Sequence, residues 1–396
     1  MPESAKNLQT EKMVINMGPS HPCTHGTVKL LVTLDGETIE DLKVDIGYLH
    51  RGFEKMCENG TYEQAIPYTD RLNYVSPLIN NVGYALAVEK LFGVQAPERC
   101  QYIRVIASEM ARICDHFTVI AAGGMELGAF SVFLYFVEAR DLLWDLLEEL
   151  CGARVTANFV RIGGLKNDLP DGFAGKLAAA FKICRPLWQD VNKLLTKNRI
   201  FIDRVRNVGT MPAQEAMAYG FTGPCLRASG VPYDVRKAQP YLVYDQMDFE
   251  VPVGETGDSF DRYLVRMEEI NQSMRIVEQA LAKIPAGPIN LDLPGLRWQS
   301  KDDTYNRIES LIYHFKTVTE GVKPPAGEIY SAVEGANGEL GFYLVSDGSG
   351  KPYKCRVRPP CFPLVAAMPR MLRGRLIADV VPTFGMINMI GGECDR

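Results

Sequence analysis

Hydrophobic and β-branched residues near the N-terminus predict a pair of strands. Val28–Leu34 is rich in strand formers, and Thr38–Asp45 continues the pattern beyond Asp35-Gly36. An Asp-Gly pair between two such segments favours a tight turn, because glycine readily adopts the left-handed backbone that hairpin turns need. We therefore expect a β-hairpin over residues 28–45.

The middle of the chain carries the three-to-four-residue hydrophobic spacing of helices. This pattern runs from residue 77 to about 151, with breaks at 93–97 and around 123–128, and Pro97 followed by Glu98 suits a helix start. A short helical segment is expected after Pro212. Further helices are expected over 173–197, 258–284 and 302–315, of which 258–284 is charged and periodic enough for one amphipathic helix.

The C-terminal quarter returns to the pattern of strands. Glu328–Glu334, Glu339–Val345 and Tyr353–Arg358 are expected strands, with a turn at residues 347–350. The sequence therefore predicts an α+β protein with a central helical bundle and β structure in its N- and C-terminal regions. We expect three regions: a β-rich region over 1–76, a helical core over 77–320, and a β-rich region and tail over 321–396.

One hydrophobic stretch has the length of a membrane span. Phe117–Val137 is 21 residues long, and Glu126 is its one charged residue. Gly123, Gly124 and Gly128 crowd its middle, and its flanks lack a positive-inside asymmetry. We interpret it as parts of two helices that meet in a protein core. Glu126 is then a carboxylate in apolar surroundings, which must be paired, protonated or hydrogen-bonded.

Composition and charge narrow the classes of function. The net charge of −5 and the pI near 5.7 give no basic footprint, so nucleic acid is not expected as a partner. Met1–Lys12 is polar and of mixed charge, unlike a signal peptide, so a cytoplasmic chain is expected. Neither a GxGxxG motif after a strand nor a GxxxxGK[ST] motif occurs, so nucleotide cofactors have no support.

The cysteines bear on metal binding. Ten are present, and no two lie three residues apart, so the CxxC spacing typical of zinc and iron–sulfur ligands is missing. In a cytoplasmic chain most of them are expected to be buried thiols. No metal site is expected in this chain.

Two short segments hold residues suited to proton chemistry. Gly18–Gly26 is a glycine- and proline-rich loop that contains His21 and His25 and is expected just before the first strand. Pro67–Pro77 contains Tyr74 and has the composition of a helix entry. Either segment alone is also explained by an ordinary turn histidine or an ordinary helix start. A loop held around a ligand is the sharper alternative.

Taken together, these segments resemble the quinone-site subunit of respiratory complex I, often called its D subunit. GPSHPCTHG at 18–26 is similar to the family signature GPQHPSTHG, and the following segments resemble further signatures of the family. These are IGYLHRGFEK at 46–55, PYTDRLNYVS at 67–76, GFTGPCLRASGVPYDVRKAQ at 220–239, VYDQMDFEVPVGETG at 243–257, DRY at 261–263, GFYLVSDG at 341–348 and GECDR at 392–396. The resemblance covers nearly the whole chain, from residue 14 to residue 396.

That family itself resembles the large subunit of nickel–iron hydrogenases, whose metal is held by two CxxC pairs. In this chain the region of the first pair reads DRLNYVS, and the C-terminus reads GGECDR without a second pair. The resemblance therefore implies a hydrogenase-like core that has lost its metal, with the vacated pocket taking quinone.

The resemblance also implies a role for two side chains. A quinone headgroup has two carbonyl oxygens, and its reduction by two electrons requires two protons, so the site needs two proton donors about one ring apart. In the family these are the second histidine of the GPxHPxxHG loop and the tyrosine that ends DRLxY, which correspond to His25 and Tyr74. Their ordinary pKa values, about 6.5 and about 10, suit that task. The electrons are implied to come from a 4Fe–4S cluster in a neighbouring subunit.

Two positions depart from the family pattern. Glu126 stands where relatives usually carry an aspartate that hydrogen-bonds the site histidine; it can fix the imidazole tautomer, or it is a structural acid at a helix junction. Thr156 stands where many relatives have a histidine close to the cluster. Its loss is compatible with menaquinone, a quinone of lower potential, although ubiquinone stays open.

Two further residues are assigned by the resemblance. Arg51 matches an arginine near the neighbouring cluster, with a structural salt bridge to Glu54 or Asp70 as the alternative. Ile390 corresponds to a residue of the quinone cavity.

The resemblance implies that the chain works only within a multisubunit NADH-quinone oxidoreductase. The expected partners are the terminal-cluster (B) subunit, the C subunit and the quinone-channel (H) membrane subunit, at the cytoplasmic side of the membrane. A hydrogenase large subunit is disfavoured because it requires four ligand cysteines. The other alternative is a non-catalytic scaffold protein in a hydrogenase-like or ferredoxin-quinone oxidoreductase complex.

Overall fold

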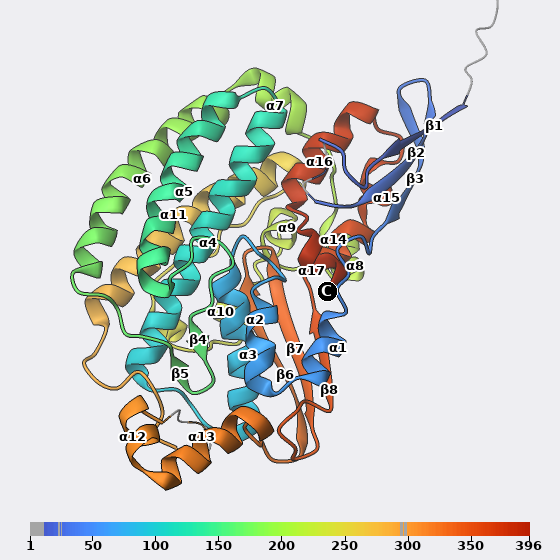
Figure 1. The fold of residues 1–396 in the computed structure, drawn as a ribbon. Coiled ribbons are helices and arrows are strands. Elements are labelled where there is room, and N and C mark those ends of the chain that lie inside the picture. Colours follow the sequence, from blue (N-terminus) through green and yellow to red (C-terminus); the bar gives the residue numbers. More distant parts are fainter. Residues whose placement is uncertain (1–11, 23, 25, 294–295, 297–298) are drawn as a thin grey trace, which may run out of the picture.

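The computed structural model describes residues 12–22, 24, 26–293, 296 and 299–396. In this part of the chain, long helices form the body, and small antiparallel sheets lie near both ends of the sequence (Figure 1). The expected α+β class with a central helical bundle is therefore confirmed. The division at residues 76 and 320, and the likeness to hydrogenases, stay predictions.

The N-terminal sheet contains the expected hairpin and one strand more. Its antiparallel order is β1 (Lys12–Met17), β2 (Lys29–Asp35) and β3 (Thr38–Asp45). Asp35 pairs with Thr38 across a turn in which Gly36 has a φ of 61°, as the Asp-Gly signal predicts. β1 was not predicted, so the histidine-containing loop lies between β1 and β2 and not before the first strand.

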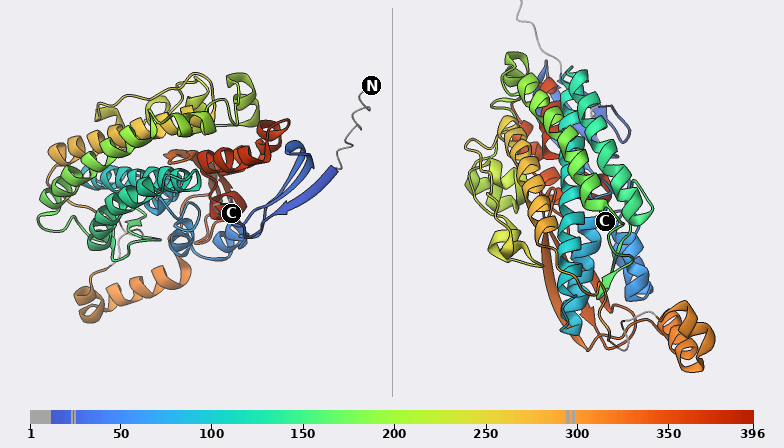
Figure 2. Two further views of the ribbon diagram at one scale, coloured as in Figure 1. Left: turned by 90° about the horizontal axis from the view of Figure 1, so that it is seen from above. Right: turned by 90° about the vertical axis from the view of Figure 1, so that its left-hand side faces the viewer.

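Five long helices make up the body: α3 (Pro77–Phe92), α4 (Glu98–Glu126), α5 (Phe130–Cys151), α6 (Phe173–Leu195) and α11 (Ser259–Lys283). α4 packs against α3, α5 and α11 and is buried along most of its length (Figures 1 and 2). The expected break at 123–128 begins only after Glu126. Gly123 stays helical and allows close packing, since a Cβ there would lie 2.7 Å from Cε of Met386.

The hydrophobic stretch at 117–137 is divided between α4 and α5, as expected. Among the described helices, none is long and apolar enough to cross a membrane. The stretch is not wholly inside a core, however. Met125, Phe130 and Leu134 are 38%, 57% and 51% exposed at the tip of the α4–α5 hairpin.

α11 confirms the helix expected over 258–284 but differs from it in where its charges lie. Asp258 caps the helix by accepting a 2.8 Å hydrogen bond from the backbone N–H of Asp261. Arg262, Arg266 and Glu269 are fully buried, so part of the charged pattern faces inward. Spacing alone could not separate a solvated face from a buried ionic one.

The shorter elements connect the long helices. They are α1 (Phe53–Asn59), α2 (Tyr62–Thr69), the hairpin β4 (Val160–Arg161) and β5 (Gly164–Leu165), α7 (Arg199–Val205), α8 (Ala213–Tyr219), α9 (Gly223–Ala228), α10 (Val235–Ala238) and η1 (Tyr244–Gln246). The helix expected over 302–315 is two helices, α12 (Lys301–Asn306) and α13 (Ile308–Glu320). They are separated at Arg307, whose backbone is extended.

The C-terminal sheet has the expected strands, in the antiparallel order β6 (Gly327–Gly335), β7 (Gly338–Ser346) and β8 (Lys354–Arg358). The expectation of a β-rich region and tail is wrong for the residues after β8, which are helical. They form α14 (Cys361–Ala366), α15 (Met368–Leu372), η2 (Ile377–Asp379), α16 (Val380–Ile387) and α17 (Gly391–Asp395). None of these helices exceeds eight residues, which is too short to show helical periodicity.

Two hydrophobic cores follow from this arrangement. The larger core joins the long helices to the C-terminal sheet. The smaller core joins the N-terminal sheet to α8, α9 and the C-terminal helices. The connection between α2 and α3, which includes Tyr74, packs against the smaller core.

Candidate functional site

Tyr74 lies in the connection between α2 and α3. Pro77 occupies the first position of α3, where its missing N–H leaves no hydrogen bond unmade. The Tyr74 ring is half-buried. Burial raises the pKa of its hydroxyl, the nearby carboxylate of Asp115 raises it further, and the positive charge of Arg51 lowers it.

This connection is fastened to α4 by side-chain hydrogen bonds. The amide Nδ2 of Asn73 and the hydroxyl of Ser76 both donate to Oδ2 of Asp115, at 2.9 and 3.0 Å. Asn73, Ser76 and Asp115 are all buried. The position of Tyr74 is therefore set by α4 as well as by its own neighbours in the chain.

The C-terminal segment passes directly beside this connection. Ile390 is 4% exposed, and its backbone N–H donates to Sγ of Cys361 at 3.5 Å. A Cβ on Gly392 would lie 2.5 Å from the carbonyl oxygen of Arg71, so only glycine fits there. The structure thus brings Tyr74 and Ile390, the expected cavity residue, to the same core.

The terminal GECDR segment also binds the segment at 46–55. The carboxylate of Asp395 accepts hydrogen bonds from the backbone N–H groups of Gly47 and Leu49, at 2.9 and 2.7 Å. The Nδ1 atom of His50 lies 2.7 Å from the carbonyl oxygen of Asp395. Three of the segments that carry the family resemblance therefore meet in space.

Arg51 faces the tyrosine connection and not Glu54. Its Nη2 donates to the carbonyl oxygen of Arg71 at 2.7 Å, whereas Glu54 forms its ion pair with Arg356. Burial raises the pKa of Asp70 to about 6, and the charges of Arg71 and Arg51 oppose that rise. The salt bridge considered between Arg51 and Glu54 therefore does not form.

His25 lies outside the described residues. Its neighbour Gly26 is described and lies close to the C-terminal segment. A Cβ on Gly26 would be 3.5 Å from both the backbone N of Gly391 and Sδ of Met389. The role of His25 stays a prediction.

Glu126 is the last residue of α4. It is half-buried and not enclosed, so the expectation of a carboxylate deep in apolar surroundings is wrong. One turn earlier, Gly123 packs on Met386 of α16, the helix that leads to Ile390. Glu126 thus lies at the end of α4 that is joined to the C-terminal helices.

Thr156 lies in the connection between α5 and β4. Its φ of 54° is left-handed, which is uncommon for a β-branched residue. A residue held in this conformation is over-determined by its surroundings. Its place near a neighbouring cluster stays a prediction.

The sequence did not identify a buried polar group below Tyr74. Cys361 donates its thiol hydrogen to Oε2 of Glu393 at 2.6 Å, and Nδ2 of Asn337 donates to the Cys361 sulfur at 3.2 Å. Nδ2 of Asn388 donates to Oδ1 of Asp115 at 2.7 Å. One available signal was Asp115, an acid in the otherwise apolar run RICDHF of α4. The others are dispersed along the chain and gave none.

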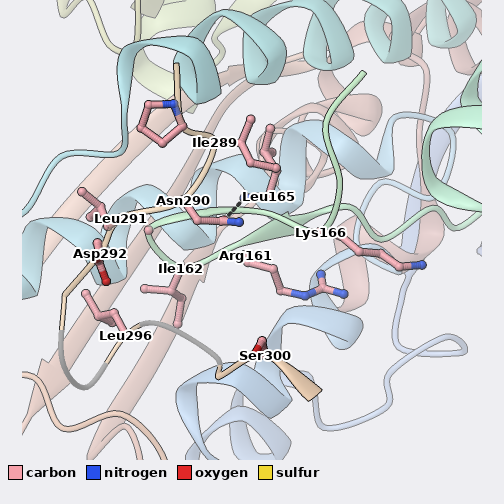
Figure 3. A pocket seen from close by; sticks show the side chains of 12 residues that line it. Arg161, Ile162, Leu165, Lys166, Ile289, Asn290, Leu291, Asp292, Leu296 and Ser300 are labelled. Carbon is pink, nitrogen blue, oxygen red and sulfur yellow. Dashed lines mark hydrogen bonds between the residues drawn. The ribbon is translucent and has the colours of Figure 1, made fainter. Parts of the chain in front are cut away.

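Two cavities lie away from these residues. One, of about 710 Å³, is lined by β4, β5 and the segment before α12, including Arg161, Lys166 and Asn290 (Figure 3). The other, of about 390 Å³, is lined by Glu89, Arg104 and neighbours. Neither includes Tyr74, Arg51, Glu126 or Ile390 among its lining residues.

The thiols and acids of the described chain do not form a metal centre. No group of three or more His, Cys, Asp or Glu residues within the described ranges is arranged to hold a metal ion. The nine described cysteines are buried free thiols. Burial raises the pKa of Cys184 and Cys394 to about 12, so both are protonated near neutral pH.

Comparison with known proteins agrees with the arrangement of these segments. The family described as "Respiratory-chain NADH dehydrogenase, 49 Kd subunit" matches residues 126–396. The first of two NADH-quinone oxidoreductase D subunits of Sorangium cellulosum is 55% identical over 395 residues, covering 100% of this chain and 98% of that protein. The D subunit of Myxococcus xanthus is 54% identical over 390 residues, covering 98% of this chain and 94% of that protein.

A fused relative is also similar. The NADH-quinone oxidoreductase C/D subunit of Bdellovibrio bacteriovorus is 48% identical over 389 residues, covering 98% of this chain and 70% of that protein. The chain belongs to the family of the D, or 49 kDa, subunit of respiratory complex I. It is one part of a multisubunit oxidoreductase of the respiratory chain.

Proposed function

We propose that this chain forms the quinone headgroup site of its complex, with His25 and Tyr74 as the two proton donors. Glu126 hydrogen-bonds His25 and orients its ring, Ile390 lines the cavity, and Arg51 lies on the side of the neighbouring cluster. The quinone, ubiquinone or menaquinone, is the substrate.

The observation that carries this proposal is the setting of Tyr74. A half-buried tyrosine lies between segments 46–55, 67–76 and 388–395, with Arg51 close enough to lower the pKa of its hydroxyl. Burial favours the protonated phenol, which can donate a hydrogen bond to a quinone carbonyl. As charge develops on the reduced oxygen, the same hydroxyl can transfer its proton.

The electrons are proposed to come from a 4Fe–4S cluster of the neighbouring B subunit. The residues of this chain then bind and orient the headgroup and supply protons. The cavities described above do not include Tyr74, which fits a site whose remaining walls come from partner subunits. The H subunit of the membrane arm is proposed to provide the channel for the quinone tail.

The C subunit is a further proposed partner. The relative in Bdellovibrio bacteriovorus is named as a C/D subunit, so the two subunits are joined in one chain there. We propose that this chain is held at the cytoplasmic side of the membrane through its partners.

The test compares quinone reduction with an activity that bypasses the site. In the complete complex, Tyr74→Phe or His25→Ala should abolish NADH-driven reduction of a short-chain quinone, while reduction of a water-soluble artificial acceptor continues. Tyr74→Phe keeps the ring, so packing is preserved and only the hydroxyl is lost. Glu126→Gln should leave assembly intact and slow quinone turnover.

The scaffold alternative makes a different prediction. If both activities of the Tyr74→Phe complex fall together with loss of assembly, the chain is a scaffold without a catalytic role. Wild-type quinone turnover in Glu126→Gln would contradict the role of that carboxylate. Tyr330→Phe, which removes the hydroxyl of a tyrosine in β6 that is 47% exposed, is the matched control and should leave both activities unchanged.

A further inference from the structure

Asp115 is a fully buried carboxylate on α4 that the proposed chemistry does not use. Its two oxygens accept hydrogen bonds from three side chains that belong to separate segments. Oδ2 accepts from Asn73 and Ser76, and Oδ1 accepts from Asn388. All three donors are neutral, so the carboxylate holds these segments by hydrogen bonding and not through an ion pair.

The hydrogen bonds of Asp115 reach the backbone on both sides of Tyr74. Asn73, which donates to Asp115, uses its own Oδ1 to accept from the backbone N–H groups of Val75 and Ser76, at 3.1 and 3.3 Å. The backbone oxygen of Asn73 accepts from Asn80 of α3 at 2.9 Å. The backbone before and after Tyr74 is therefore fixed relative to α4.

The other oxygen fixes the C-terminal segment. Asn388 follows α16 with a left-handed φ of 54°, and its Nδ2 also donates to Oδ1 of Asn337 at 2.6 Å. Asn337 returns a hydrogen bond from its Nδ2 to the carbonyl oxygen of Asn388 at 2.9 Å. Two residues further along, Ile390 enters the smaller core.

We infer that Asp115 is a positioning residue for quinone reduction, which sets the place of the Tyr74 hydroxyl relative to α4 and to the C-terminal segment. It acts through Asn73, Ser76 and Asn388 and does not itself contact the quinone. This inference rests on the proposed function of Tyr74.

The helix itself makes Asp115 suited to this role. Glu126 is 11 residues further along α4 (126 − 115), close to three full turns, so both carboxylates project from the same stripe of the helix about 16 Å apart. On a neighbouring side, Nε2 of His116 lies 2.7 Å from Oε2 of Glu269 on α11, which fixes the rotation of α4. One rigid helix therefore positions the tyrosine connection and carries the proposed partner of His25.

The test exchanges the amide and the carboxylate of one hydrogen bond. In Asp115→Asn, the introduced amide oxygen can still accept from Asn73 and Ser76, but its NH₂ group then faces the NH₂ group of Asn388. Two opposed donors force the segments apart. A displacement of about 1 Å at a reacting group lowers turnover by up to about 100-fold, so kcat for quinone should fall about 10- to 100-fold.

Adding Asn388→Asp to Asp115→Asn restores a donor–acceptor pair with reversed direction. The double variant should regain at least about fivefold in kcat over Asp115→Asn. Recovery stays partial because Asn388 also donates to Asn337. The KM for quinone should change less than kcat in each variant, and reduction of a water-soluble acceptor should be unchanged.

Two further variants keep the result interpretable. Ser76→Ala removes one of the three donors and should lower kcat about two- to fivefold with normal assembly. It decides the question if Asp115→Asn fails to assemble. Thr118→Val is the matched control, because it removes a hydrogen bond between α4 and Arg140 of α5 on a different side of the helix, and it should leave kcat unchanged.

The inference is overturned by a kcat within twofold of wild type in assembled Asp115→Asn, by no recovery in the double variant, or by wild-type kcat in Ser76→Ala. Its failure differs from failure of the proposed function. If Tyr74→Phe abolishes quinone reduction while Asp115→Asn does not change it, only the positioning role is lost. If Tyr74→Phe itself is as active as wild type, the proposed function fails first.

Discussion

Consecutive residues of α4 belong to two buried polar clusters with opposite electrostatic character. Asp115 belongs to the site cluster, which consists of Asn73, Ser76, Asp115, Asn337, Cys361, Asn388 and Glu393. His116 belongs to the scaffold cluster, which consists of Glu109, Arg112, His116, Arg227, Asp234, Arg236, Glu269 and Glu334. Both are shielded from solvent, and they differ in how their carboxylates are neutralised.

In the scaffold cluster the acids are paired with guanidinium groups. Burial raises the pKa of Glu109, but the charges of Arg112 and Arg236 outweigh it and bring the pKa down to about 2. Tyr244 also donates to Glu109, at 2.7 Å. Burial likewise raises the pKa of Asp234, and Arg236 and Arg227 lower it to about 2. These carboxylates stay charged at any physiological pH.

In the site cluster the acids have neutral partners. No described lysine or arginine lies within salt-bridge distance of Asp115 or Glu393. Burial raises the pKa of Glu393 to about 7, and the hydrogen bonds from Cys361 and Asn337 only partly offset that rise. A group with such a pKa can gain or lose a proton under physiological conditions, as expected near a site that handles protons.

The comparison teaches that burial of charge has two uses in this molecule. Full pairing in the scaffold cluster fixes every protonation state and ties α4, α9, α10, α11 and β6 together. The missing cations in the site cluster leave protonation adjustable beside Tyr74. Three changes would break or sharpen this contrast.

The largest effect is expected from unpairing the scaffold cluster. Arg227→Met leaves the buried carboxylates of Glu269 and Glu334 without their guanidinium partner, since Arg227 bonds both. Removing one member of a buried ion pair costs about 3–5 kcal/mol in the free energy of unfolding. Little of the variant should accumulate in assembled complex, as measured by quantifying the protein in purified membranes.

The control for this change is an ion pair at the surface. Arg185 and Glu278 pair at 2.8 Å with both side chains more than 40% exposed. Arg185→Met should therefore cost no more than about 1 kcal/mol and leave assembly normal. Normal amounts of Arg227→Met in the complex would contradict a structural role for the scaffold cluster.

A smaller effect is expected where the C-terminal segment passes the tyrosine connection. Gly392→Ala places a Cβ 2.5 Å from the backbone oxygen of Arg71, so one of the two segments must move. Overpacking of this kind costs about 1–3 kcal/mol. We expect a lower midpoint of thermal inactivation of the complex and a larger fall in quinone turnover than in artificial-acceptor activity.

The matched control is Gly175→Ala in α6, where a new Cβ would meet no atom within 4 Å. Alanine is favoured over glycine inside a helix, so stability should be unchanged or slightly higher. Equal behaviour of the two variants would mean that the C-terminal segment is not packed tightly against the tyrosine connection.

The smallest effect concerns Glu393 and the pH dependence of stability. Its pKa is raised from 4.5 to about 7 in the folded protein, so the native state binds more protons than the unfolded chain between those values. The stability contribution of this group is full below about pH 4.5, falls as the pH rises towards 7, and is constant above that.

Glu393→Gln removes this dependence while keeping a hydrogen-bonding side chain. Relative to wild type, the variant should gain about 1–2 kcal/mol in the free energy of unfolding between pH 5 and pH 8. Thermal inactivation of the complex across this range measures the difference. The exposed Glu309→Gln serves as control, and a wild-type pH profile in Glu393→Gln would show that the buried carboxyl is not protonated near neutral pH.

Local sequence determined most of the secondary structure. The strands at 38–45 and 354–358 and the long helices α3, α4, α6 and α11 follow from periodicity, turn residues and caps that act within a few positions. The C-terminal helices could not be predicted in this way. They are short, and contacts with the N-terminal sheet and with α4 hold them together.

The candidate site divides along the same line. Tyr74, Arg51 and Ile390 were identified from motifs, and the structure brings them to one region. The cluster that fastens them was not identified, because Asp115, Asn337, Cys361 and Asn388 lie on four distant segments. A hydrogen bond between residues 273 positions apart, as between Asp115 and Asn388, leaves no local signal.

The sequence by itself therefore determined the family, the α+β class and the identity of the proposed proton donors, since motifs and short-range periodicity encode these directly. The tertiary structure decided which buried charges are neutralised. Whether a carboxylate on α4 meets a guanidinium or an amide depends on segments that arrive from elsewhere in the chain. That choice separates the scaffold cluster from the site cluster, although Asp115 and His116 are adjacent residues.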